Sequence, residues 1–221
     1  MLDVAAMHAE LQRTLELVQT GRIRERPNYR SIPAELLNFG HVALSGDGEP
    51  TLSPNFPEIV QTVLHLRAQG RFPFFKLVLI TNASGLDRPE VVRTLNLFTS
   101  RDEIWVKLDA GSQKHLRQVN RTECRLDDLL TNIVNVGRTR PVIIQSLFPS
   151  INGAGPTPNQ IEDYVQRLNQ LKEAGTEVSL VQIYSSNRPS GDAACSHLSL
   201  TGLSRIARRV REVTGLRTEV F

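Results

Sequence analysis

Cysteine is scarce in this chain, with only Cys124 and Cys195 among 221 residues, far apart and in loop-like contexts. They form no Cys-x-x-Cys pair and lack zinc-ligand spacing, so no metal site is expected from them. We interpret both as buried or incidental free thiols. Four of the five histidines have no paired or helical spacing, so a metal cluster made of them is not expected: His41, His65, His115 and His197.

Long hydrophobic runs are also missing. No apolar stretch reaches the roughly 20 residues that a membrane-spanning helix needs. The first 20 residues do not form a cleavable signal, because Asp3, Glu10 and Arg13 interrupt the apolar positions. We therefore expect a soluble, cytoplasmic protein with no membrane partner.

Lysine is rare, since only four of the 26 basic residues are lysines. Arginine suits phosphate and carboxylate recognition because its planar group donates two parallel hydrogen bonds. The net charge is only +3, however, so nucleic-acid binding is permitted but not indicated. The basic segment at residues 22–30 is typical of a solvated connector, with a binding patch as the alternative.

The hydrophobic pattern predicts an α/β fold. The chain is 40% hydrophobic and has no dividing linker, so we expect residues 1–221 to form a single domain. After an amphipathic helix at 3–20, strands and helices alternate. Repeated β-α units predict a mostly parallel sheet curled into a partial TIM-type (β/α) barrel. Strands are expected at 41–45, 76–81, 103–109, 141–148, 177–184 and 217–221, and helices at 57–69, 89–98, 113–119, 126–138, 157–174 and 199–214.

The segment best suited to a ligand follows the first strand. It reads Ser-Gly-Asp-Gly-Glu-Pro and places Asp47 and Glu49 at the carboxyl end of that strand, where α/β sheets bind ligands. Gly48 permits close approach of the backbone to a ligand, because it has no Cβ. The alternative is a Gly-Pro turn with solvated acids.

The third strand carries the other charged candidates. Side chains alternate along a strand, so Trp105, Lys107 and Asp109 share one face, while Val106 and Leu108 lie on the apolar face toward the helices. Buried charges need partners, and Lys107 can be neutralised by Asp109 or by Glu49. A purely structural ion pair is the alternative to a binding site.

Polar residues at other strand ends complete the candidate set. Asn82 and Ser84 end the second strand, where an Asx-turn is the structural alternative to ligand contacts. Gln145 and Gln182 interrupt two buried strands, and a buried amide requires a partner. Arg188 is a candidate anion contact.

These motifs, in this order, resemble the radical S-adenosylmethionine (SAM) superfamily, over roughly residues 42–221. Asp47-Gly48-Glu49-Pro50 resembles its Gly-Gly-Glu element, and the set is most similar to the branch with the tRNA wyosine-base synthases. Thr122 and Ser150 depart from the family pattern, since proline and glycine are expected there. The further matching segments are Ile80-Thr81-Asn82-Ala83-Ser84, Val106-Lys107-Leu108-Asp109-Ala110-Gly111, Val119-Asn120-Arg121-Thr122, Pro149-Ser150-Ile151-Asn152-Gly153 and Val181-Gln182-Ile183-Tyr184.

The resemblance implies a SAM site at the carboxyl ends of the strands. Gly48 and Glu49, with Asp47 beside them, would hold the methionyl ammonium of SAM. Lys107 would contact its carboxylate and Asp109 its ribose. The resemblance further implies that Asn82 and Ser84 orient the ligand and that Gln145 and Gln182 line the SAM or substrate pocket.

The family's iron–sulfur ligands are missing from these residues. Radical SAM enzymes hold a [4Fe–4S] cluster through a Cys-x3-Cys-x2-Cys loop after the first strand, and SAM is cleaved reductively there to a 5′-deoxyadenosyl radical. The sequence contains neither that loop nor, by its pattern, that first strand. Cys124 and Cys195 lie far downstream and are not clustered, so we expect no cluster and no metal ligands in the chain as printed.

Three hypotheses follow. The chain is an N-terminally incomplete radical SAM barrel, inactive as given, which would need an electron donor once complete; this is our preferred expectation. Alternatively, it is a cluster-less relative that binds SAM or a nucleotide without radical chemistry. The third is an unrelated aldolase-like barrel that uses Lys107 as a Schiff-base nucleophile beside Asp109. The substrate stays open between RNA, with tRNA modification implied by the resemblance, a peptide and a small molecule.

Overall fold

Six parallel strands form the main sheet. The computed structural model describes residues 2–37, 39–46, 48–185 and 195–221. Within this part of the chain the strand order is β1-β2-β3-β4-β6-β8, and neighbouring strands are parallel throughout. The bounds are β1 (His41–Leu44), β2 (Lys76–Thr81), β3 (Glu103–Lys107), β4 (Val142–Leu147), β6 (Val178–Tyr184) and β8 (Thr218–Val220).

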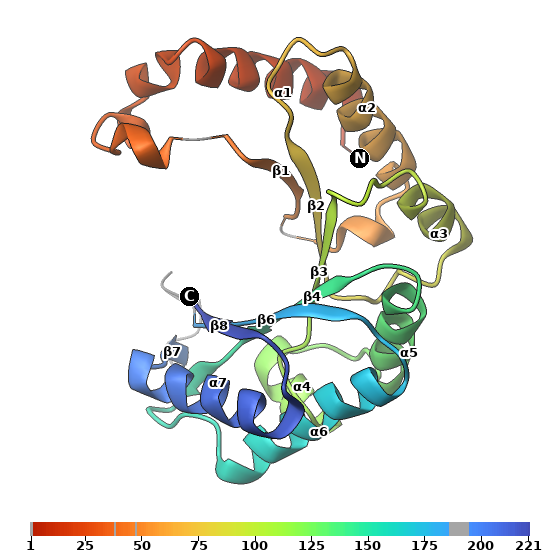
Figure 1. Cartoon of the computed structure of the whole chain (residues 1–221), viewed down its shortest axis with the longest axis vertical. Coiled ribbons are helices and arrows are strands. Elements are labelled where there is room, and N and C mark those ends of the chain that lie inside the picture. Colours follow the sequence, from red (N-terminus) through yellow and green to blue (C-terminus); the bar gives the residue numbers. More distant parts are fainter. Residues whose placement is uncertain (1, 38, 47, 186–194) are drawn as a thin grey trace.

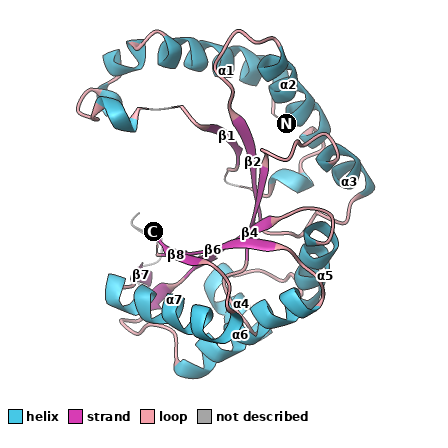
Figure 2. Ribbon diagram, in the orientation of Figure 1, coloured by secondary structure: helices cyan, strands magenta, loops and turns pink. Residues whose placement is uncertain are grey.

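Helices cover the convex face of this sheet. The strands curve into an open C with the helices on its outside (Figures 1 and 2), so the predicted α/β partial barrel with a mostly parallel sheet is confirmed. Among the described residues, no helix is long and apolar enough to cross a membrane. The α-helices are α1 (Val4–Gln19), α2 (Phe56–Ala68), α3 (Pro89–Leu95), α4 (Gln113–Asn120), α5 (Leu126–Gly137), α6 (Pro158–Glu173) and α7 (Leu200–Thr214), and the 3-10 helices are η1 (Arg22–Glu25), η2 (Pro27–Tyr29), η3 (Ala34–Leu36) and η4 (Pro50–Leu52).

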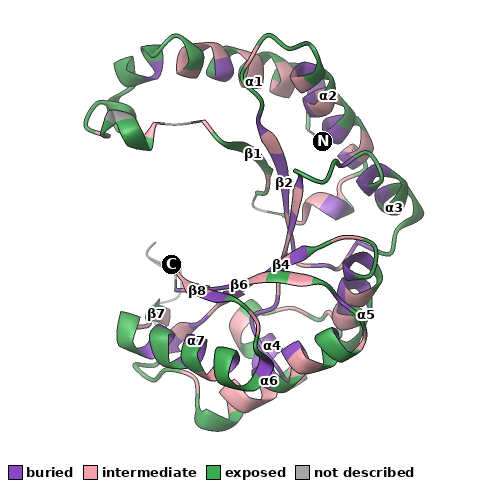
Figure 3. Cartoon of the chain, in the orientation of Figure 1, coloured by how far each residue is buried: buried purple, intermediate pink, exposed green. Residues whose placement is uncertain are grey.

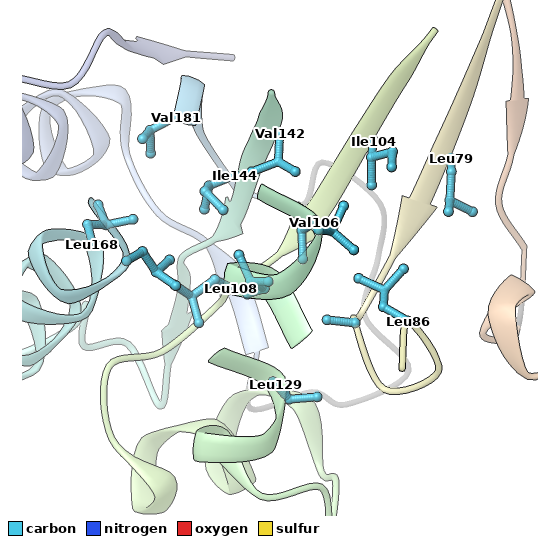
Figure 4. Close-up of a cluster of buried hydrophobic side chains, with 14 of the residues drawn as sticks. Leu79, Leu86, Ile104, Val106, Leu108, Leu129, Val142, Ile144, Leu168 and Val181 are labelled. Carbon is cyan, nitrogen blue, oxygen red and sulfur yellow. The ribbon is translucent and has the colours of Figure 1, made fainter. Parts of the chain in front are cut away.

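The hydrophobic core lies between the convex face of the sheet and the helices. Along β3 the side chains alternate as predicted: Ile104 and Val106 are fully buried, whereas Trp105 and Lys107 are partly exposed on the concave face. Figure 3 shows burial concentrated on the strands and on the inner sides of the helices. The close-up in Figure 4 shows the resulting cluster, in which strand and helix side chains interlock: Leu79, Ile104, Val106, Val142, Ile144 and Val181 from strands, with Leu86, Leu108, Leu129 and Leu168.

A small second sheet was not predicted. Strand β5 (Pro149–Ile151) pairs antiparallel with β7 (Cys195–His197). Asn152 and Gly153, with φ of 53° and 77°, form a tight two-residue turn, across which Ile151 and Ala154 exchange backbone hydrogen bonds of 2.8 and 3.0 Å. Two consecutive residues with positive φ are typical of an Asn-Gly turn. The three-residue strands are too short for an alternation pattern to identify.

Asp102, just before β3, joins three elements and is buried, with its side chain fully covered. Its carboxylate accepts two hydrogen bonds from Arg67 of α2, at 2.6 and 3.1 Å. It also accepts from the backbone N–H of Leu77 in β2 at 2.7 Å, and from the N–H and hydroxyl of Thr99 at 2.7 and 2.9 Å. Burial opposes its ionisation, but these donors outweigh burial and lower the pKa of Asp102. This network fixes the amino ends of β2 and β3.

Gly111 sets the loop after β3 directly against helix α6. A Cβ built there would lie 2.1 Å from the backbone of both Asp163 and Tyr164, and the Gly111 carbonyl accepts a hydrogen bond from Arg167 at 2.9 Å. Backbone atoms cannot rotate away as the end of a side chain can. Only glycine therefore fits where this loop meets α6.

We expect Gly111→Ala to lower the free energy of unfolding by about 3 kcal/mol or more, the upper end of the overpacking range. Urea denaturation measures it. Gly40→Ala is the matched control, because a Cβ at Gly40 meets nothing within 4 Å. Equal midpoints for the two variants would contradict the close approach.

Candidate functional site

Glu49 connects the carboxyl ends of β1 and β2. It is the N-cap of η4, and its Oε1 accepts from the N–H and hydroxyl of Thr51 at 3.1 and 2.6 Å and from the Thr81 hydroxyl at 2.6 Å. Its Oε2 accepts from the Asn82 N–H at 2.7 Å. The side chain is therefore positioned by four donors, two from Thr51 in η4 and two from Thr81 and Asn82 at the carboxyl end of β2.

One oxygen of Glu49 retains accepting capacity. A carboxylate has about four lone-pair positions over two oxygens. Among the described residues, Oε1 has three donors and Oε2 has one, and Glu49 is only partly buried. Oε2 can therefore accept a further hydrogen bond. A cavity of about 470 Å³ adjoins this residue, lined by Ser45, Gly48 and Glu49 with apolar side chains of α1 and α2, which is within the usual size range of small-molecule sites.

The turn after β2 is tightly held. Asn82 Oδ1 accepts from the Ser84 N–H at 2.9 Å, which is the Asx-turn considered above. Ala83 has a φ of 69°, and its carbonyl accepts from Asn132 of α5 at 2.9 Å. The hydroxyl of Ser84 is buried with no hydrogen-bond partner in the described structure. Asn82 and Ser84 thus have a structural role here, and their contact with a ligand stays a prediction.

Lys107 forms the centre of a second polar cluster, on the concave face. Its ammonium donates to the hydroxyl of Tyr184 at 2.8 Å and lies 3.7 Å from Asp109 Oδ2. The predicted pairing of Lys107 with Asp109 is present. Burial disfavours its charge, but Asp109 and Tyr184 outweigh burial and raise the pKa of Lys107.

Asp109 is buried, with only 1% exposure. Its Oδ1 accepts from the Leu147 N–H and its Oδ2 from Asn120, both at 2.7 Å. These bonds attach the end of β3 to β4 and to α4. The side chain of Asp109 is fully covered, so the geometry supports a role in which Asp109 positions Lys107 and Asn120. The contact of Asp109 with a ribose stays a prediction.

Gln145 and Gln182 face each other across β4 and β6. They are paired in register, and Gln145 Nε2 donates to Gln182 Oε1 at 3.2 Å. Lys107 pairs in register with Gln145, so the amide pair lies beside the Lys107 cluster. The expected amide partner is therefore present, and each amide keeps a further polar atom for a ligand.

Some candidates lie outside this geometry. Asp47 and Arg188 are outside the described residues. Gly48 is exposed, and a Cβ there would meet nothing within 4 Å, so nothing in the described part of the chain requires glycine at that position. Cys124 and Cys195 are unbridged thiols. Within the described ranges no group of three His, Cys, Asp or Glu side chains could hold a metal ion, and two cysteines cannot supply the three thiolates of a [4Fe–4S] cluster.

Another cavity, of about 810 Å³, lies between α3 and α5 near the amino ends of β3 and β4, with Phe98, Glu103 and Arg140 in its lining. Arg140 donates to the carbonyls of Leu95 and Thr99 at 3.1 and 2.8 Å, so its guanidinium is engaged within the protein. Barrel folds bind ligands at the opposite, carboxyl ends of the strands. We therefore place the candidate site at the carboxyl edge.

Sequence reasoning missed Tyr184 as a site residue. It is the last residue of β6, and alternation places it on the same face as Gln182. Its contact with Lys107 links β3 to β6 across β4 and 77 positions of sequence. The curvature of the sheet brings Lys107 and Tyr184 together, and no local sequence pattern predicts this contact.

Solved structures share this partial-barrel fold. The chain superposes on a radical SAM methyltransferase from Sphaerobacter thermophilus with a TM-score of 0.68 and 17% identity, covering 100% of this chain and 57% of that one. It superposes on SuiB from Streptococcus suis with a TM-score of 0.61 and 15% identity, and on SuiB bound to S-adenosylmethionine with 0.61 and 16%. Both SuiB matches cover 82% of this chain and 39% of SuiB.

Among curated proteins, the UPF0026 protein slr1464 from Synechocystis sp. (strain ATCC 27184 / PCC 6803 / Kazusa) is 37% identical over 95 residues. The match covers 42% of this chain and 32% of that protein, so the chain spans about a third of its curated relative's length. No family model matches the chain.

Proposed function

We propose that this chain binds S-adenosylmethionine at the carboxyl edge of its barrel. The observation that carries the proposal is a pair of polar clusters at neighbouring strand ends: Glu49, with an acceptor position that no described donor occupies, and the Lys107 ammonium. A methionyl ammonium suits the first and a methionyl carboxylate the second. A neighbour of the same fold, SuiB, is known with SAM bound.

In this proposal each cluster has a defined task. Glu49, fixed by Thr51 and Thr81, accepts the ligand's ammonium at Oε2. Lys107 attracts its carboxylate, and the amides of Gln145 and Gln182 offer hydrogen bonds to the remaining ligand or to a substrate. When bound, SAM supplies a sulfonium that is cleaved reductively in radical SAM enzymes. That step needs three thiolates from outside these 221 residues and an electron donor. RNA, including tRNA, stays one proposed substrate class beside a peptide or small molecule.

The Schiff-base hypothesis is weakened by the state of Lys107. A nucleophilic lysine must lose its proton, and such lysines are activated by a lowered pKa. Here Asp109 and Tyr184 raise the pKa of Lys107. Borohydride trapping of a carbonyl substrate on Lys107 would revive this candidate. The second hypothesis, a cluster-less relative that binds SAM, also predicts that the chain binds SAM.

Calorimetric titration of the chain with SAM tests the proposal. We expect saturable one-to-one binding. The Glu103→Gln variant is the matched control, because Glu103 lies on the same concave face near the amino ends of the strands, where it pairs with Lys76. No detectable binding to either protein would refute the proposed function.

A further inference from the structure

Among the described residues, no acceptor pairs with the proton of the Tyr184 hydroxyl. The hydroxyl accepts the hydrogen bond from Lys107 at 2.8 Å, and no other hydrogen bond of this hydroxyl exists among the described residues. A tyrosine hydroxyl both accepts and donates, so with respect to the described residues its own O–H can donate to a ligand. The residue is only partly buried, so a ligand can reach it.

Lys107 strengthens that donor. Hydrogen bonds from a charged donor are shorter and stronger than neutral ones, and successive hydrogen bonds polarise one another. The ammonium also lies 5.4 Å from the centre of the Tyr184 ring, so its charge lies close to the phenol. Asp109, fixed by Asn120 and Leu147, holds the ammonium from the other side. The arrangement is a short chain from carboxylate to ammonium to phenol, and no described residue accepts from its last O–H.

The position of this O–H suits a ligand group at the rim. Tyr184 is the last residue of β6 and pairs in register with Leu147, one inward-facing position beyond the Gln145–Gln182 pair. The Lys107–Tyr184 contact therefore passes over the concave side of β4 at its carboxyl end.

We propose that Tyr184 donates its hydroxyl proton directly to the carboxylate of the bound SAM, so that Lys107 and Tyr184 together form a two-residue carboxylate site. This inference rests on the proposed function and adds a residue and a specificity to it. A nucleoside with a carboxylate at this position is preferred over one without it. No covalent step is involved.

The test compares SAM with 5′-methylthioadenosine, which keeps the adenosine and the sulfur but lacks the amino acid part. Calorimetry on the wild-type chain and on Tyr184→Phe gives four affinities. We expect Tyr184→Phe to weaken SAM by about 10- to 100-fold, in line with the loss of one hydrogen bond to a charged group, and to leave the affinity for methylthioadenosine within about twofold. Tyr164→Phe is the matched control, since its hydroxyl is buried against Ser146 at 2.6 Å; it should leave the SAM to methylthioadenosine ratio unchanged.

Lys107→Met, alone and combined with Tyr184→Phe, distinguishes a direct contact of Tyr184 with the ligand from a role of Tyr184 in positioning Lys107. If Tyr184 touches the ligand, Tyr184→Phe still weakens SAM in the Lys107→Met background. No further loss there would mean that Tyr184 only positions Lys107, and would overturn the inference. Equal losses for both ligands, or none, would overturn it as well while leaving the proposed function intact. Failure of the wild-type chain to bind either ligand would refute both.

Discussion

Replacing Asp102 by alanine is expected to lower the free energy of unfolding by about 3–5 kcal/mol, the usual cost of removing one partner of a buried ion pair. The variant removes the carboxylate that accepts from the Arg67 guanidinium and from the N–H groups of Leu77 and Thr99. Urea denaturation followed by the fluorescence of Trp105, the single tryptophan, measures it. Asp87→Ala, at an exposed position, is the control and should change stability by less than about 0.5 kcal/mol.

The same substitution has a defined pH dependence. Since the pKa of Asp102 is lowered in the folded state, its stabilisation is present above the unfolded pKa of about 4 and is lost as the pH falls through the folded value. The stability difference between the wild type and Asp102→Ala should therefore be full at pH 6–7 and shrink below about pH 4. A difference that stays constant down to pH 3 would contradict the assignment of a charged Asp102.

Replacing Glu49 by glutamine is expected to weaken SAM binding by about tenfold or more. A hydrogen bond to a charged group contributes about 1.5–3 kcal/mol, and about 1.4 kcal/mol corresponds to a factor of ten. Glutamine removes the charge that attracts the ammonium. It also places an amide where Oε1 and Oε2 now accept from four donors. Calorimetry with SAM measures the loss.

Glu49→Gln has two controls, a ligand that lacks the ammonium and the same substitution at another position. 5′-Methylthioadenosine lacks the ammonium, so its affinity should change little if the turn after β2 keeps its shape. Glu103→Gln makes the same change at the opposite end of the strands and should leave SAM binding unchanged. A Glu49→Gln variant that folds and binds SAM as the wild type does would exclude Glu49 from the site.

Much of the fold could be predicted because its determinants are local. The alternation of Ile104 and Val106 with Trp105 and Lys107 identified both the strand β3 and its buried face. Gly215, with a φ of 68°, ends α7 where the sequence predicted. The β5–β7 sheet was missed because its strands are three residues long and distant in sequence.

The candidate site was only partly predictable. The strand pattern predicts which polar residues, such as Glu49 and Lys107, lie at or just after the carboxyl ends of strands. Which of their atoms remain available does not, because that depends on donors from other strands: Thr81 engages one oxygen of Glu49, and Leu147 one of Asp109. The burial of Asp109 and the contact of Lys107 with Tyr184 are likewise products of tertiary packing.

The most direct test of this account is where the ligand lies. A crystal structure of the chain with SAM should place the methionyl ammonium beside Oε2 of Glu49 and the carboxylate beside Lys107 and Tyr184. SAM found instead in the cavity near Arg140, at the amino ends of β3 and β4, would contradict it.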